Sequence, residues 1–247
     1  KNISNQMNKL TNIVRWFLSL LRNSGCNRDL VEYDSNDLKI SIEKGEEWLH
    51  NFPLFLGINI KNPPQIAIWT EDMEGNYLST VYVTHKIATQ SWQASGGNRR
   101  KEALPHWCYQ RGIQYEDGLY LPSKKEPLTD GISGATPKGS FNVKMSPTGK
   151  LKKFIVKIEI NHSTDFNDAY PKSAKEGDAN YSGGKEGSGQ PDLVYAAEVD
   201  LTSGKKEFTA KLIGHSSPDG SNGDLTKDTS SLTTALHIVK SITVYVQ

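Results

Sequence analysis

The sequence predicts an all-β protein, an antiparallel β-sandwich that follows a short N-terminal amphipathic helix and carries long loops. Two observations support this class. From residue 36 onward, apolar and polar residues alternate with a period of two, as in strands that bury one face. Gly-rich turns separate these short runs, which is typical of sandwiches rather than of βαβ units. We therefore expect a helix and linker at residues 1–35 and one β-sandwich domain at residues 36–247.

Before residue 36 the apolar period is helical. Apolar side chains recur at spacings of three and four and would form one face of a helix: Leu10, Ile13, Val14, Phe17, Leu18 and Leu21. Ser24-Gly25-Cys26 follows and resembles the cleavage box of bacterial lipoproteins, although Asn23 stands where a leucine-like residue is usual and Arg22 interrupts the apolar run. Two interpretations stay open, a packing helix and a membrane anchor through a lipidated Cys26.

The expected strands follow in chain order. The first contains Leu38, Ile40 and Ile42, which would all face inward. The others are residues 65–70 and 77–84, joined by a hairpin turn at Glu74-Gly75-Asn76; residues 140–146; residues 154–160; residues 193–201 and 207–214, joined by a second hairpin turn at Thr202-Ser203-Gly204; and a last strand with Leu236, Ile238, Ile242, Val244 and Val246 on one face.

Charge and composition exclude several classes of protein. The chain has 29 basic and 28 acidic side chains, a net charge of +1, which argues against a dedicated nucleic-acid binder. No apolar run approaches the length of a transmembrane helix. The two cysteines, Cys26 and Cys108, are too few for a disulfide-dense scaffold or, by themselves, a four-ligand zinc site. They could pair with each other across a large sequence separation, but we interpret them as free thiols, with Cys108 packed beside Trp107.

One segment carries a chemically specific pattern. Asp130-Gly131-Ile132-Ser133-Gly134-Ala135-Thr136 resembles the attachment motif of extracytoplasmic flavoproteins of the FMN-binding-domain type. In that family a flavin transferase joins FMN to the final threonine through a phosphoester. The resemblance implies that Thr136 is the acceptor, that Asp130 is recognised by the transferase, and that Ser133, Gly134 and Ala135 form a small accessible loop. The alternative is a Gly-rich structural turn before the strand at 140–146.

A second resemblance extends over most of residues 37–247. It rests on Asn62–Trp69, Thr80–Thr84, Asp130–Pro137 and Tyr195–Ala197, which are similar to a bacterial family of predicted periplasmic proteins of unknown function. Members of that family are often encoded near flavin transferases or fused to them. The resemblance implies a periplasmic or envelope location and a link to flavin. It implies no established activity. Together with the attachment motif, it suggests a redox module that carries FMN on Thr136 and exchanges electrons with membrane partners.

Long loops suggest a different function. Residues 93–129 and 170–192 are unusually long connections, and such loops are often functional. Aromatic residues in or beside them could recognise a glycan or a protein without a cofactor, although some must belong to the core: Trp92, Trp107, Tyr109, Tyr115, Tyr120 and Tyr181. The basic cluster Arg99-Arg100-Lys101 could contact a flavin phosphate or a partner's carboxylates, but such clusters are usually solvated, and we assign it no role.

Other candidate residues give weaker signals. His162 and His215 lie at expected strand ends, where Asp165, Asp168 or His106 could complete a metal site, or where they cap turns and bond to the backbone. Residues 219–228 are rich in oxygen ligands but lack the EF-hand order, which favours a solvated turn. No G-x-S-x-G elbow, Rossmann or P-loop pattern occurs, so an electron-transfer or binding protein is favoured over a hydrolase.

Overall fold

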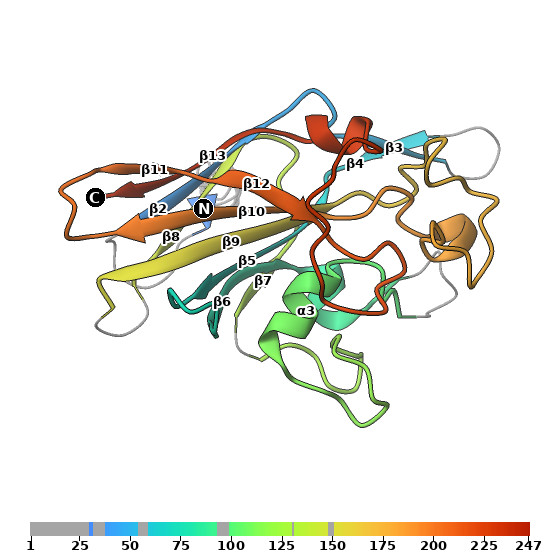
Figure 1. Cartoon of the computed structure of the whole chain (residues 1–247), viewed down its shortest axis with the longest axis horizontal. Coiled ribbons are helices and arrows are strands. Elements are labelled where there is room, and N and C mark those ends of the chain that lie inside the picture. Colours follow the sequence, from blue (N-terminus) through green and yellow to red (C-terminus); the bar gives the residue numbers. More distant parts are fainter. Residues whose placement is uncertain (1–29, 32–37, 54–58, 93–98, 130, 148–150) are drawn as a thin grey trace, which may run out of the picture.

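The computed structural model describes the chain except for residues 1–29, 32–37, 54–58, 93–98, 130 and 148–150. In the described part, two β-sheets stack face to face, so the predicted β-sandwich is confirmed (Figure 1). The expected helix at residues 10–21, the candidate lipidation site Cys26 and the motif residue Asp130 lie outside the described residues. Within the residues that can be placed, no helix is long and apolar enough to span a membrane.

The first sheet begins with a strand from the expected linker. Leu30 and Val31 pair in parallel with the strand at 141–145, so this part of residues 1–35 joins the sandwich. The remaining neighbours in this sheet are antiparallel. In spatial order its described strands are β1 (Leu30–Val31), β8 (Phe141–Met145), β2 (Leu38–Lys44), β13 (Val239–Val246) and β11 (Glu207–Thr209).

The second sheet is also mostly antiparallel, with one parallel pair at its edge. In spatial order its described strands are β12 (Lys211–His215), β10 (Leu193–Asp200), β9 (Lys153–Asn161), β5 (Gln65–Glu71), β6 (Tyr77–Thr84) and β7 (Ile132–Gly134). β7 lies parallel to β6. A separate antiparallel ribbon is formed by β3 (His50–Pro53) and β4 (Asn59–Asn62).

The first predicted hairpin is confirmed. β5 and β6 pair in antiparallel register and are joined by a short turn. In that turn the Asp72 carboxylate accepts the backbone N–H of Asn76 at 2.8 Å and that of Glu74 at 3.0 Å. Gly75 has a φ of +87°, a conformation that glycine adopts without a steric penalty.

The second predicted hairpin is wrong in one respect. β10 pairs with β12, as expected for a hairpin, but β11 pairs with β13 in the opposite sheet. Ala210 lies between β11 and β12, where the chain passes from one sheet to the other. An alternating pattern cannot reveal such a crossing, because both sheets bury the same kind of face.

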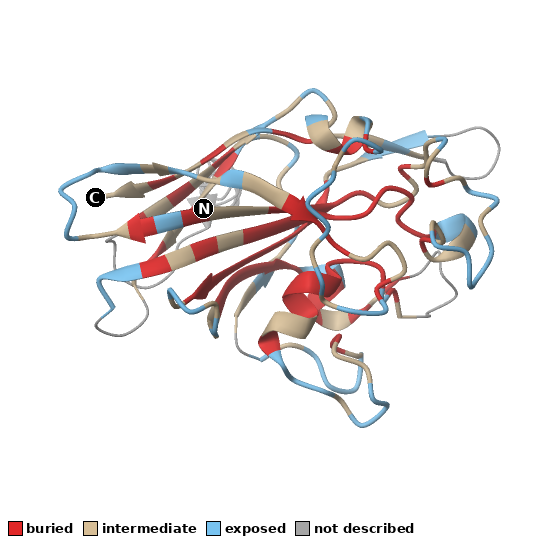
Figure 2. Cartoon of the chain, in the orientation of Figure 1, coloured by how far each residue is buried: buried red, intermediate tan, exposed pale blue. Residues whose placement is uncertain are grey.

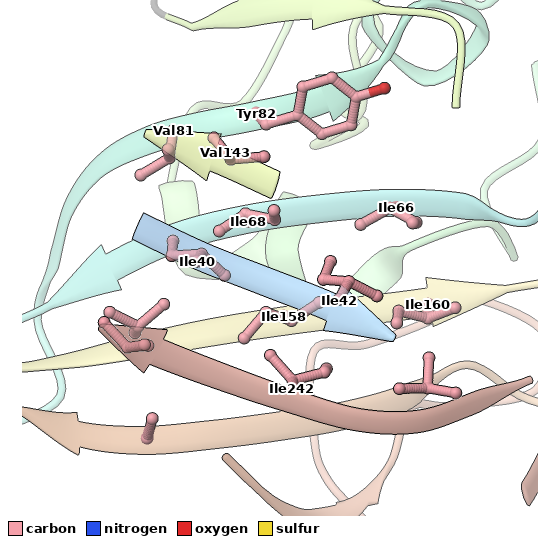
Figure 3. Packing of buried hydrophobic residues seen from close by; sticks show 14 of the residues in the cluster. Ile40, Ile42, Ile66, Ile68, Val81, Tyr82, Val143, Ile158, Ile160 and Ile242 are labelled. Carbon is pink, nitrogen blue, oxygen red and sulfur yellow. The ribbon is translucent and has the colours of Figure 1, made fainter. Parts of the chain in front are cut away.

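The core between the sheets follows from the predicted alternation. On β2, Leu38, Ile40 and Ile42 are buried, while the residues between them are only half-buried. Isoleucine side chains from both sheets meet in this layer (Figure 3). Burying one such side chain contributes about 1.5–3 kcal/mol to stability. The labelled core residues are Ile40, Ile42, Ile66, Ile68, Val81, Tyr82, Val143, Ile158, Ile160 and Ile242.

The outer face of the second sheet is covered as well, which alternation did not predict. The helices α2 (His85–Thr89) and α3 (Pro105–Arg111) contribute buried residues there, and β5 is buried along its whole length (Figure 2). A second apolar cluster forms under them, and it contains Trp92, Trp107 and Cys108. The prediction that Cys108 is a free thiol packed with Trp107 is therefore confirmed.

The C-terminal strand is shorter than predicted. Residues Thr234–His237 form a 3₁₀ helix, η3, and β13 begins only at Val239. Ile242 and Val244 point into the core, as expected, whereas Leu236 lies outside the strand. The loop at 170–192 contains a second 3₁₀ helix, η2 (Gly184–Glu186).

Candidate functional site

The motif at residues 130–136 occupies an edge of the second sheet. Residues 132–134 form β7, where the sequence predicted an accessible loop. Ser133 and Ala135 are exposed, in agreement with that prediction, and Gly134 is half-buried. A Cβ atom on Gly131 would lie 2.9 Å from the Thr80 side chain, so glycine allows this segment to approach β6 closely.

Thr136 does not have the exposure that the sequence predicted. It is 7% exposed, and its hydroxyl oxygen lies 2.8 Å from that of Thr84 on β6. Thr84 follows the core residue Tyr82 by two positions, so both point to the inner face of β6. The Thr136 hydroxyl is therefore held at the margin of the sandwich interior, and the prediction of a solvent-facing acceptor is wrong for this conformation.

Two further hydrogen bonds hold the same segment closed. The Tyr82 hydroxyl donates to the backbone carbonyl of Gly134 at 3.2 Å. The indole N–H of Trp48 donates to the carbonyl of Pro137 at 3.0 Å. Burial raises the pKa of Tyr82 to about 12, so this hydroxyl stays protonated and able to donate at physiological pH.

The motif thus fits a phosphoester acceptor in residue type but not in conformation. Thr136 supplies an alcohol. Ser133 and Ala135 are exposed and small, so they place no bulky side chain beside the adjacent backbone. The acceptor oxygen, however, points to Thr84 and away from any solvent-borne donor. A flavin could be attached to Thr136 only after this edge of the sheet had opened.

A buried polar cluster on the outer face of the second sheet was missed by the sequence patterns. Glu159 on β9 is fully buried, where alternation suggested a polar outer face. One carboxyl oxygen accepts the backbone N–H of His106 at 3.1 Å, and the other accepts that of Trp107 at 2.7 Å. These bonds satisfy the free N–H groups at the start of α3. Glu159 therefore fastens α3 to the sheet.

Lys157 continues this cluster toward β5. Its ammonium group lies 2.9 Å from the Glu71 carboxylate and 3.4 Å from the Nε2 atom of His106. The Nδ1 atom of His106 lies 2.6 Å from the carbonyl of Gly223, which can only accept, so Nδ1 carries the proton and Nε2 accepts from Lys157. Glu71, His106 and Lys157 each have a polar or charged partner here, which indicates a structural network.

Burial shifts the titration of the two groups that hold α3. Desolvation raises the pKa of Glu159 to about 8, against the opposing effect of the Trp107 and His106 N–H groups. Desolvation also lowers the pKa of His106 to about 4, and the hydrogen bond to Gly223 opposes this change. Both groups are therefore held largely neutral near pH 7.

The basic cluster at residues 99–101 is not uniformly solvated, although such clusters usually are. Arg100 is 4% exposed and pairs with Glu102 at 2.7 Å. It also donates to the hydroxyls of Ser163 and Ser188. Arg99 pairs with Asp117, and only Lys101 is exposed. Arg100 thus joins the long loops to one another and is not available to a flavin phosphate.

The candidate histidines bond to the backbone, as one of the two interpretations expected. The Nε2 atom of His162 lies 2.8 Å from the carbonyl of Glu47, and the Nδ1 atom of His215 lies 2.8 Å from the carbonyl of Ser216. His162 also packs against the ring of His50, with 5.2 Å between ring centroids. Over the residues that are described, no group of three His, Cys, Asp or Glu side chains is placed to hold a metal.

The loop at 219–228 forms the kind of turns that its composition favours. The Asp219 carboxylate accepts the N–H of Ser221 at 3.0 Å, and the Asp228 carboxylate accepts that of Ser230 at 2.9 Å. Side-chain oxygens that bond their own backbone in this way are typical of Asx turns. The predicted turn is confirmed at these positions.

Partly exposed tyrosines remain on the face that the long loops cover. Tyr109 on α3 stacks on Tyr120, with 4.4 Å between ring centroids, and its hydroxyl donates to the carbonyl of Ser221 at 2.8 Å. Tyr115 and Tyr181 are also half-buried. The two tryptophans expected among the aromatic residues, Trp92 and Trp107, are in the core instead.

Comparison of the chain with protein-family models, curated proteins and solved structures finds no match.

Proposed function

We propose that this chain is a carrier of covalently bound FMN in the cell envelope, with Thr136 as the attachment point. The observation that supports the proposal is the seven-residue pattern at 130–136, whose described part forms the short edge strand β7 and the residues beside it. The bound flavin would supply electron transfer with membrane redox partners. The chain itself would supply the threonine and a β-sandwich that carries it.

The attachment reaction needs an activated donor, because the phosphate of free FMN is a poor electrophile. A flavin adenine dinucleotide meets this need. Its phosphoanhydride bond breaks, the Thr136 oxygen forms an ester with the FMN phosphorus, adenosine monophosphate leaves, and the hydroxyl proton is released. A flavin transferase is the partner that the proposal requires.

The test is the intact mass of the full chain after co-expression with a flavin transferase. We expect the mass of one FMN less one water on the wild type and a yellow protein. Thr136→Ala should carry no adduct, whereas the matched variant Ser133→Ala, which removes the exposed hydroxyl of the same motif, should carry it fully. Expression without the transferase is the control for colour.

Two results would refute this assignment. An adduct that persists in Thr136→Ala but disappears in Ser133→Ala would place the flavin on Ser133. The FMN-carrier function would be refuted if the wild type never gained the mass of FMN while a known substrate of the same transferase did.

Envelope location is part of the same proposal and has its own test. The sequence pattern before Cys26 motivates a lipid anchor on that residue. Fractionation of cells should recover the wild type with membranes and a Cys26→Ser variant with the soluble periplasmic fraction. Recovery of both in the cytoplasm would contradict the extracytoplasmic location.

A second candidate function is a binding module for a glycan or a protein. The partly exposed tyrosines Tyr109, Tyr115, Tyr120 and Tyr181 favour it, because tyrosine offers flat apolar area and a hydroxyl together. A glycan array probed with the wild type and with Tyr120→Ala tests it. Signal that depends on Tyr120, in protein without flavin, would favour this function over the first.

A further inference from the structure

The edge strand β7 is held to the sandwich by a small set of contacts. It pairs with β6 over only three residues, in which Tyr82, Val83 and Thr84 face residues 132–134 in register. Among the described residues, its side-chain hydrogen bonds include those of Thr84 with Thr136, of Tyr82 with Gly134, and of Trp48 with Pro137. We use the name β7 latch for the hydrogen bonds that the Thr84 and Tyr82 hydroxyls make to this segment.

An edge strand of this length can open without unfolding of the domain. β7 is the last strand of its sheet in the described part, whereas β5 and β9 are paired on both sides. Ser133 and Ala135 are exposed, so the segment buries little apolar surface beyond Ile132. Segments with few buried contacts open at a lower free energy than the core strands.

We infer that the β7 latch controls access to Thr136, so that the folded chain is modified only in a minor open state in which residues 132–137 leave β6. This inference rests on the proposed function, because it concerns the same threonine. The physical reason is that the acceptor oxygen bonds to Thr84 in the closed state and is 7% exposed. The modification rate is then proportional to the population of the open state.

The test measures the rate at which purified, folded full-length chain gains one FMN from flavin adenine dinucleotide and a flavin transferase. Thr84→Val and Tyr82→Phe each remove one hydroxyl of the latch. We expect each variant to be modified about tenfold faster than the wild type, the factor that corresponds to one net hydrogen bond. Two variants are needed because Thr84 also accepts the N–H of Ile66 at 2.9 Å, while Tyr82→Phe leaves that bond intact.

Two matched controls separate the latch from general destabilisation. Thr84→Ser keeps the hydroxyl and should be modified at close to the wild-type rate. Ile242→Val removes a methyl group from the core at β13, in the opposite sheet, and should also leave the rate unchanged. A rate that rises equally in Ile242→Val would show that global unfolding exposes Thr136, and the latch would be rejected.

Amide hydrogen exchange provides a readout that needs no flavin. The amides of β7 that bond to β6 should exchange faster than those of β5 and β9, and Thr84→Val should accelerate them about tenfold without changing β9. Exchange of β7 as slow as that of β9 would contradict a local opening.

The failure of this inference can be distinguished from the failure of the proposed function. If the co-expressed wild-type chain gains no FMN, the proposed function is refuted. The β7 latch then cannot control flavin attachment either. If that chain gains FMN, and folded wild type is then modified as fast as Thr84→Val and Tyr82→Phe, the carrier function stands and the latch is refuted.

Discussion

Thr136 illustrates how a residue's partners can override its sequence context. Gly134 and Ala135 before it, and Pro137 and Gly139 after it, suggest an open turn. The Thr136 hydroxyl nevertheless forms a hydrogen bond with Thr84, which is 52 positions away in sequence. Burial of an alcohol without a partner would cost about 1–3 kcal/mol, so the two threonines stabilise each other's position.

Glu159 gives the protein a specific dependence of stability on pH. Its pKa is raised from the ordinary 4.5 to about 8, so the folded chain holds a proton that the unfolded chain releases between these values. The free energy of unfolding should therefore fall as pH rises from 6.5 to 8, by up to about 1.4 kcal/mol per unit. Below pH 6.5, His106 and His162, with pKa values lowered to about 4 and about 3, contribute in the opposite sense, because they must be protonated on unfolding.

Urea unfolding at several pH values checks this prediction. Glu159→Gln should flatten the decline between pH 6.5 and 8, while Glu198→Gln, at an exposed position on β10, should keep the wild-type slope. Equal slopes in all three proteins would mean that Glu159 is ionised in the folded chain.

At the scale of elements, β9 is the strand on which the second sheet depends. It lies between β5 and β10, and its alternate residues face two different buried layers. Ile158 points into the core between the sheets, while Lys157 and Glu159 point to α3 and the loops. A strand that is buried on both faces need not be apolar on both, provided that each polar group finds a partner.

Truncation on β9 tests this role. Ile158→Ala leaves a cavity at a position with no exposure and should lower the free energy of unfolding by about 2–5 kcal/mol. Leu151→Ala, just before β9 and 38% exposed, should change it by no more than about 0.5 kcal/mol. Urea denaturation measures both, and comparable losses in the two variants would argue against the described packing of β9.

At the scale of the whole molecule, two apolar layers share the second sheet. One lies between the sheets, and the other lies beneath α2, α3 and the long loops. Cys108 belongs to the outer layer and is 3% exposed. Burial raises the pKa of the Cys108 thiol, which disfavours the reactive thiolate.

Cys108 therefore reports on the integrity of the outer layer. In a Cys26→Ser variant, alkylation of Cys108 should be about a thousandfold or more slower in the folded chain than in urea, since it requires cooperative unfolding. Mass spectrometry of a timed iodoacetamide reaction measures the rate. Rapid alkylation in native buffer would show that α3 leaves the sheet independently.

The class of fold, the position of most strands and the β5–β6 hairpin could all be predicted from the sequence alone. A period of two is a local property of the chain, and residues such as Leu38, Ile40 and Ile42 can only bury one face of an extended strand. The chemical identity of the motif, including Thr136 and Ser133, is likewise readable without coordinates.

Three features are visible only in the folded chain: β11 changes sheets, Glu159 is buried beneath α3, and Thr136 faces Thr84. Each of these depends on partners that are distant in sequence, and the same alternating pattern is compatible with either sheet and with either an open or a covered outer face. The energy that selects among them comes from long-range packing and from the pairing of buried polar groups, neither of which is encoded in any single segment.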